Sequence, residues 1–214
     1  MSINQSPIIK LIFLHIPKTG GCTFLEILKR CYKKNEIYNI YGYDNQIEYL
    51  LEKLKHNPKS NISQIKLVQG HFQFGIHNFL TPEYKYITLL RDPLDRIISH
   101  YEYIKKSKNH PLNKIVETKK LSLTEYVTSG ISTELNNGQT RLLSGLENDY
   151  SFGDCPQIML DTAFNNLQYS FCCVGVMEEY ELFLNSFFNL IKSPRIHYKV
   201  KNAQIRKLNV VSAP

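Results

Sequence analysis

A glycine-rich turn near the amino terminus has the composition of an anion-binding loop. The residues Pro-Lys-Thr-Gly-Gly-Cys-Thr, 17–23, follow an apolar run and open a stretch with helical spacing. Such a turn presents unpaired backbone N–H groups and the positive end of a helix to a ligand, and Lys18 adds a full charge. The segment therefore predicts a phosphate site. Its spacing differs from GxxxxGK[ST], which disfavours an ordinary nucleoside triphosphatase loop, and a tight turn with a solvated lysine remains the alternative.

Arg91 and Ser99 are candidates for a second anion site. Arg91 follows the apolar run 86–90, and a buried parallel strand delivers the residue after it to the carboxyl edge of the sheet, where ligands bind. Ser99 lies about two turns into the following helix, so its hydroxyl could add a hydrogen bond to the same ligand. Taken singly, Arg91 could instead pair with a nearby carboxylate, and Ser99 could be an ordinary helical serine.

The elements that must position these residues alternate between strand and helix. Apolar runs predict strands at 8–16, 65–69, 86–90 and 171–176, and helical spacing or capping signals place helices that begin near 23, 47, 93, 122, 159 and 180. This alternation predicts a single α/β domain with a P-loop-like parallel sheet of about four to five strands flanked by helices. The polar stretch 105–120 is predicted to be a loop.

Composition limits the classes of protein that the chain can belong to. The 214 residues are 43% hydrophobic, enough for one packed domain, and the net charge of +7 favours an anionic ligand. Five cysteines without a CxxC pair argue against a structural zinc site and favour a reducing compartment. Neither a signal peptide nor a membrane-spanning run is evident, so we expect a cytoplasmic protein.

Several segments, taken in order, resemble sulfotransferases that use 3′-phosphoadenosine 5′-phosphosulfate (PAPS). His15 to Gly21 is similar to the 5′-phosphosulfate motif and Leu90 to Pro93 to the 3′-phosphate motif. Gln69 to Phe72 resembles the Gly-His segment that supplies the catalytic base. Asn137 to Gly145 and Ala163 to Glu179 also look like family segments, so the likeness covers most of the chain. The resemblance is to the group that contains heparan sulfate and uronyl 2-O-sulfotransferases.

The resemblance implies a set of donor-binding residues. The 5′-phosphosulfate would be held by Lys18, Thr19, Gly20, Gly21, Cys22 and Thr23, the 3′-phosphate by Arg91 and Ser99, and a late covering loop would contribute Asn202 and Arg206. Cys22 stands where the family has Ser or Thr, so we expect weaker donor binding rather than loss of function. Gln69 replaces a second histidine of the glycan enzymes, which leaves the acceptor open.

In-line sulfuryl transfer needs a base for the acceptor hydroxyl and positive charge near the leaving phosphate. His71 suits the first role, because a histidine with an ordinary pKa near 6.5 accepts protons at neutral pH and such assistance contributes about 10²–10⁴-fold. Lys18 suits the second role. We expect PAPS as co-substrate, the bisphosphate (PAP) as product and no metal, because no carboxylate cluster suited to Mg²⁺ is evident. His15, at the end of a buried strand, is predicted to be a hydrogen-bonded core residue.

The expected acceptor is a hydroxyl group of a carbohydrate, in a glycan or glycolipid, and not a nucleic acid. The competing interpretations are a kinase-like phosphotransferase, a sulfotransferase-like nucleotide-binding protein without activity, and a nucleic-acid binder, for which the basic and aromatic residues are too scattered.

Family members continue into a further carboxyl-terminal helix, so we expect the domain of residues 1–214 to lack it.

Overall fold

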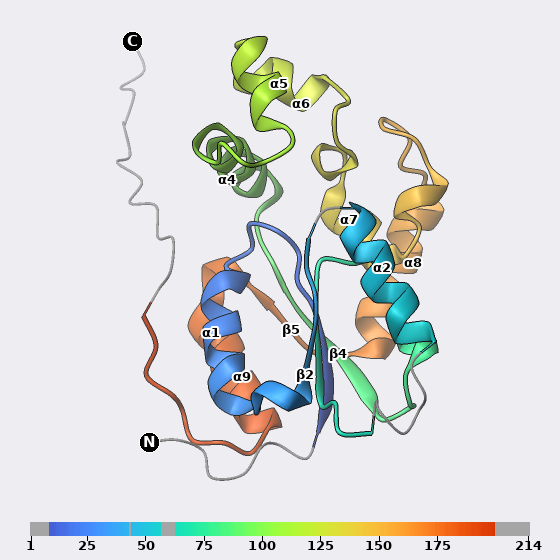
Figure 1. The fold of residues 1–214 in the computed structure, drawn as a ribbon, viewed down its shortest axis with the longest axis vertical. Helices are drawn as coiled ribbons and strands as arrows, with labels where there is room; N and C mark the ends of the chain where they lie inside the picture. Colours follow the sequence, from blue (N-terminus) through green and yellow to red (C-terminus); the bar gives the residue numbers. More distant parts are fainter. Residues whose placement is uncertain (1–8, 43, 57–62, 200–214) are drawn as a thin grey trace.

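Five parallel strands form one sheet at the centre of the molecule (Figure 1). The computed structural model describes residues 9–42, 44–56 and 63–199. The strands are β1 (Lys10–Leu14), β2 (Ile37–Ile40), β3 (Leu67–Gly70), β4 (Tyr84–Leu90) and β5 (Phe171–Val176), in the spatial order β2-β3-β1-β4-β5. The predicted α/β class and parallel sheet are confirmed.

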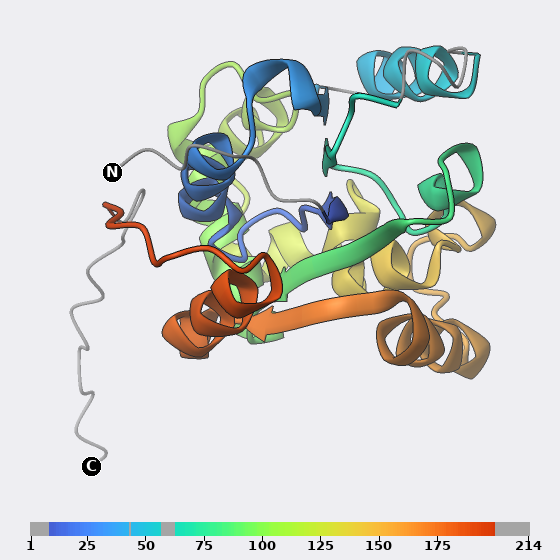
Figure 2. The same ribbon diagram turned by 90° about the horizontal axis from the view of Figure 1, so that it is seen from below.

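Helices cover both faces of this sheet. They are α1 (Gly21–Cys31), α2 (Asp44–Lys55), α4 (Pro93–Lys106), α5 (Asn113–Thr118), α6 (Leu123–Thr128), α7 (Gly138–Ser144), α8 (Gln157–Ser170) and α9 (Tyr180–Leu190), with short 3₁₀ turns η1 (Lys34–Glu36), η2 (Ile76–Phe79), η3 (Thr133–Leu135), η4 (Glu147–Asp149) and η5 (Met177–Glu179). Figures 1 and 2 show α1 and α9 on one side of the sheet and α2 and α8 on the other.

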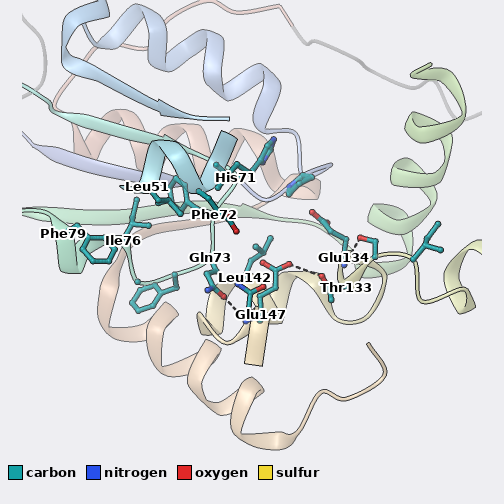
Figure 3. Close-up of a pocket in the computed structure, with 18 residues that line it drawn as sticks. Leu51, His71, Phe72, Gln73, Ile76, Phe79, Thr133, Glu134, Leu142 and Glu147 are labelled. Atoms are coloured by element: carbon teal, nitrogen blue, oxygen red, sulfur yellow. Dashed lines mark hydrogen bonds between the residues drawn. The ribbon is translucent and has the colours of Figure 1, made fainter. Parts of the chain in front are cut away.

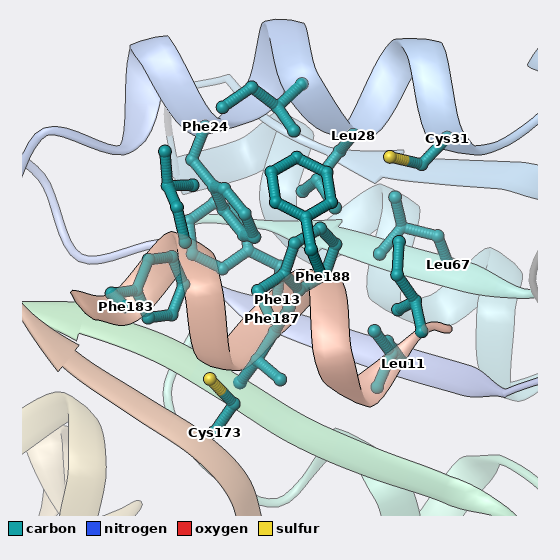
Figure 4. Packing of buried hydrophobic residues seen from close by; sticks show 14 of the residues in the cluster. Leu11, Phe13, Phe24, Leu28, Cys31, Leu67, Cys173, Phe183, Phe187 and Phe188 are labelled. Atoms are coloured by element: carbon teal, nitrogen blue, oxygen red, sulfur yellow. The ribbon is translucent and has the colours of Figure 1, made fainter. Parts of the chain in front are cut away.

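The central strand β1 is buried on both faces, as its unbroken apolar run predicts. Successive side chains of a strand point to opposite faces. Phe13 therefore packs with α1 and α9, whereas Ile12 packs with the helices of the other face. In the first of these cores, the Phe24 ring makes edge contacts with Phe13 and Phe187 at centroid distances of 5.0 and 4.8 Å (Figure 4). Aromatic packing thus fixes α1, and with it the turn that precedes α1.

A third, smaller core lies among α4, α5 and α6, which Figure 1 shows beyond one end of the sheet. The prediction that 105–120 is a loop is wrong in part, because this stretch contains α5. The Asn113 side-chain amide donates to the carbonyl of Ile104 at 2.7 Å, which ties α5 to the end of α4. Val116 is buried while Ile115 is exposed. So short a helix gives too few apolar positions for its periodicity to be recognised in the sequence.

The predicted starts of α4 and α6 are confirmed. The Asp92 carboxylate accepts from the backbone N–H of Asp95 at 2.9 Å, directly before the proline that begins α4. At α6, Ser122 and Glu125 form a reciprocal capping box. The cap at Asp92 fixes the start of α4 directly after Arg91.

Candidate active site

The carboxyl ends of β1, β3 and β4 bring the candidate residues to one edge of the sheet. In the strand register, Leu14 lies opposite both Gly70 and Thr88. The next residues along β1 and β3 are His15 and His71, so these two rings lie side by side at a centroid distance of 4.6 Å. Arg91 follows β4 at the same edge. The register therefore assembles the site from segments far apart in the sequence.

The glycine-rich turn has the backbone geometry of an anion-binding loop. Lys18 and Gly20 adopt left-handed conformations with φ of 70° and 86°. Within the described residues, no side chain caps the start of α1, and the Thr23 N–H donates to the Gly20 carbonyl at 3.2 Å. The first N–H groups of a helix lack partners within the helix, which suits them to an anion. A Cβ atom on Gly21 would lie 2.1 Å from His15 Nε2, which excludes any larger residue without displacement of that ring.

Two threonines of the turn are buried rather than displayed. Thr19 has no exposed surface, and its hydroxyl donates to the carbonyl of Ile16 at 2.9 Å. Thr23 is 4% exposed. The Thr19 side chain therefore shapes the turn. Cys22, in contrast, is exposed at the start of α1.

Two cations converge on this turn. Lys18 Nζ lies 4.3 Å from the centre of the Tyr103 ring on α4, and Arg91 Nη1 donates to the Lys18 carbonyl at 3.2 Å. Burial lowers the pKa of Lys18 from its ordinary value; nearby Cys22 opposes this shift, and the charges of Arg91 and Lys106 add to it. A bound anion would relieve that repulsion and favour the charged amine.

Arg91 is held in place by a residue that the motif comparison did not single out. The Gln139 side chain on α7 accepts from the Arg91 backbone N–H at 3.0 Å and donates to the Arg91 carbonyl at 2.8 Å. Ser99 is buried on α4, one turn before Tyr103 and so on the same face of that helix. The structure thus brings Lys18, Arg91 and the Ser99 face of α4 together.

His71 is oriented to act as a proton acceptor. Its Nδ1 lies 2.7 Å from the carbonyl oxygen of His15. Because a carbonyl can only accept, Nδ1 carries the proton and Nε2 keeps its lone pair. Burial lowers the pKa of His71 below the ordinary 6.5, although the bond to His15 and the charge of Glu134 partly oppose the shift. The ring is therefore neutral at pH 7.

Two aromatic rings, those of His15 and Tyr41, contact His71. Tyr41 contacts the ring edge-on at a centroid distance of 4.9 Å, and the Tyr41 hydroxyl lies 3.1 Å from His15 Nδ1. The prediction that His15 is a hydrogen-bonded core residue is confirmed, since it is 4% exposed.

Gln69 is also buried, and its amide donates to Asn39 at 2.8 Å within the sheet. Gln69 is not among the residues that line the cavity beside His71.

A cavity of about 800 Å³ opens beside His71 (Figure 3). Its walls come from α2, the segment that follows β3, the turns η3 and η4, and Leu142 of α7. A volume of this size is within the range of pockets for small organic ligands, about 300–1,000 Å³. Pro17, from the glycine-rich turn, also lines it, so the cavity and the turn are adjacent.

One buried arginine joins the turn to the cavity wall. Arg96 is 2% exposed; its Nε donates to the Pro17 carbonyl at 3.1 Å and its Nη1 to the Glu134 carbonyl at 3.1 Å. Nη2 forms an ion pair with the Glu134 carboxylate. A Cβ atom on Gly138 would lie 3.1 Å from Nη1, so a glycine provides the room. The analysis of the sequence did not identify Arg96 as a structural residue. The one indication in the sequence is that Arg96 shares a face of α4 with Ser99 and Tyr103.

The predicted site residues therefore fall into two groups. Those within the described part of the chain lie at the carboxyl edge of the sheet: Lys18, Thr19, Gly20, Gly21, Cys22, Thr23, His71, Arg91 and Ser99. Arg206 and Asn202 lie outside the described residues. The roles of all these residues in binding and catalysis stay predictions.

Comparison with known proteins identifies the family. The model of the sulfotransferase family matches residues 2–204. The chain belongs to the sulfotransferase family. The protein-tyrosine sulfotransferase of Arabidopsis thaliana is 30% identical over 94 residues, which are 44% of this chain and 17% of that protein. The crystal structure of mouse sulfotransferase SULT7A1 complexed with PAP is 12% identical, with a TM-score of 0.48, and the match covers 88% of this chain and 61% of that one. The chain thus spans less than two thirds of either protein.

The described residues contain neither a membrane-spanning helix nor a candidate metal cluster. Over the residues that the structure describes, none of the helices has the length and hydropathy to cross a bilayer. The same residues contain no cluster of three or more His, Cys, Asp or Glu side chains arranged to hold a metal ion.

The buried arginine gives a prediction for stability. Arg96→Met should lower the free energy of unfolding by about 3 kcal/mol, because it leaves the Glu134 carboxylate without its cation in a largely buried place. Urea unfolding followed by circular dichroism measures this. The control is Lys29→Met, which breaks the exposed Lys29–Glu26 pair and should change stability by less than about 0.5 kcal/mol. Equal effects of the two substitutions would contradict the structural role of Arg96.

Proposed function

We propose that this protein transfers a sulfuryl group from PAPS to a hydroxyl group of a carbohydrate acceptor by in-line displacement. The observation that carries the proposal is the position of His71. Its ring, with Nε2 able to accept a proton, lines a cavity next to the turn where Lys18 and Arg91 meet. Family membership supports the sulfuryl transfer.

The donor would bind at the glycine-rich turn. Its 5′-phosphosulfate would meet the N–H groups at the start of α1 and the charge of Lys18, while the 3′-phosphate would meet Arg91 and the hydroxyl of Ser99. The left-handed turn and the uncapped helix start support this assignment, because both direct backbone donors towards one anion. The lowered pKa of Lys18 supports it too, since burial is the main cause, Arg91 adds to it, and a dianionic ligand would compensate both.

In the proposed reaction, the acceptor oxygen forms a bond to sulfur while the bond from sulfur to the phosphate oxygen breaks. The acceptor proton moves to His71 Nε2, and PAP leaves with the electron pair of the broken bond. Lys18 and the N–H groups of the turn stabilise the negative charge on the leaving oxygen. The hydrogen bond from His71 Nδ1 to His15 holds the ring in the tautomer that this step needs.

The acceptor would occupy the cavity beside His71. The likeness to glycan sulfotransferases favours a sugar hydroxyl in a glycan or glycolipid. A second candidate is a phenolic hydroxyl, because the Arabidopsis relative is a protein-tyrosine sulfotransferase. Both acceptors would use the same base and the same donor site.

Donor binding is tested by titration calorimetry with PAP and with ATP. The wild-type protein should bind PAP without Mg²⁺ and more tightly than it binds ATP with Mg²⁺. Arg91→Ala should weaken PAP binding by about ten- to a hundredfold, because it removes a charge-assisted hydrogen bond to phosphate. Lys29→Ala, a control in the last turn of α1 that breaks only the exposed pair with Glu26 among the described contacts, should leave PAP binding unchanged. Tighter binding of ATP with Mg²⁺ would instead favour a kinase-like phosphotransferase.

The base is tested by the pH dependence of transfer to phenyl β-D-glucoside. Because the pKa of His71 lies below 6.5, kcat/KM should stay high as the pH falls to 6.5 and decrease only below it, where the ring becomes protonated. His71→Asn should reduce transfer by about 10²–10⁴-fold and abolish this acidic limb.

Two controls separate the loss of the base from general damage. PAP should bind His71→Asn as tightly as the wild type, and His56→Asn, which changes an exposed histidine at the end of α2, should keep full activity. Unchanged turnover of His71→Asn would remove His71 as the base. So would an acidic limb above pH 6.5 in the wild-type protein.

A further inference from the structure

The cavity beside His71 has an acidic wall. Among the 18 described residues that line it are three glutamates, Glu48, Glu134 and Glu147, and no lysine or arginine. The pKa of His71 is lowered, so the ring adds no positive charge at neutral pH. The charge of the cavity is thus opposite to that of the glycine-rich turn, where Lys18 and Arg91 are in contact. The two halves of the site therefore differ in the sign of their charge.

The glutamates come from three separate elements around the cavity. Glu48 lies on α2, Glu134 on η3 and Glu147 on η4. Figure 3 shows Glu134 and Glu147 on the same side as Thr133, whereas Leu51, Ile76 and Phe79 lie together at the other end. Two of the three glutamates therefore lie at one end of the cavity, and Glu48 lies on α2 one turn before Leu51, beside the apolar residues.

The Glu147 carboxylate is fixed where it lines the cavity. Its Oε1 accepts from the Thr133 hydroxyl at 3.2 Å, and its backbone N–H donates to the Gln73 side chain at 2.9 Å. The segment that carries it is held by Arg141, which has no exposed surface and donates to the carbonyls of Tyr150 and Ser151 at 2.8 and 2.7 Å. The Thr133 bond and the held backbone thus place the Glu147 carboxylate at the cavity wall.

We propose that this cavity takes an uncharged hydroxyl compound with an apolar group and discriminates against acceptors that carry carboxylate or sulfate. The inference rests on the proposed function, because it assigns the cavity to the acceptor. Its physical basis is repulsion between the carboxylates of the lining and an acceptor anion in a partly enclosed space, where water screens charges less than at an open surface. The charge of Glu134 is offset by its ion pair with Arg96.

The test compares phenyl β-D-glucuronide with phenyl β-D-glucuronamide, which have the same ring hydroxyls and differ by one negative charge. Their binding is measured by calorimetry with saturating PAP and again without it. We expect the amide to bind at least about tenfold more tightly than the acid, an electrostatic effect of the size expected for one charge near two carboxylates.

The origin of the discrimination is tested by substitution. The double variant Glu48→Gln and Glu147→Gln removes two carboxylates but keeps their shapes, and it should reduce the preference for the amide to less than about threefold. Glu52→Gln is the matched control. It lies on α2 one turn after Glu48, pairs with His56 and does not line the cavity, so it should keep the wild-type preference.

Each outcome of this comparison bears on the proposal. Equal binding of the two compounds, tighter binding of the acid, binding of neither, or a preference that survives in the double variant would overturn it. Failure of the donor proposal is distinguishable, because it would appear as loss of PAP binding in the same preparation. The preference measured without PAP does not depend on that result.

Discussion

A buried cation constrains the whole site. The guanidinium group of Arg96 lies out of water, and an ion there is tolerated only where carbonyl and carboxylate oxygens surround it. Those oxygens come from the glycine-rich turn and from η3, while Gly138 leaves the space that the guanidinium fills. The donor turn, the start of α7 and one wall of the cavity therefore share a single support on α4. A change in any one of them alters the surroundings of the same charge.

The parallel sheet explains why an anionic donor and an uncharged acceptor could meet at His71. Strands that run in one direction end at one edge, so the turn after β1, the histidine after β3 and the arginine after β4 adjoin one another. Lys18 and Arg91 meet at the glycine-rich turn, and the cavity that the glutamates line adjoins this turn at Pro17. Burial lowers the pKa of His71 at the same edge, which suits its proposed role as a proton acceptor.

Elements with strong local signals could be predicted, and those defined by their partners could not. The apolar run of β1 and the cap at Asp92 are properties of neighbouring residues. Strand β2 has only Ile40 buried, and it exists as an edge strand because it pairs with β3. Helix α7 follows a left-handed Asn137 without a side-chain cap in the described residues, and the hydrogen bonds of Arg141 hold it in place. Such bonds join residues at irregular spacings, so they leave no periodic trace in a sequence.

The sequence by itself determined the glycine-rich turn, because a turn depends on residue types at fixed short spacings. The order of the family motifs is also a property of the sequence, and His71 as the base is predicted from it. The tertiary structure alone decided three other features. It set the tautomer of His71 through the carbonyl of His15, it placed Gln69 inside the sheet, and it gathered the glutamates of three elements around one cavity. Charges and hydrogen bonds act through space, so their effect depends on which segments the fold brings together.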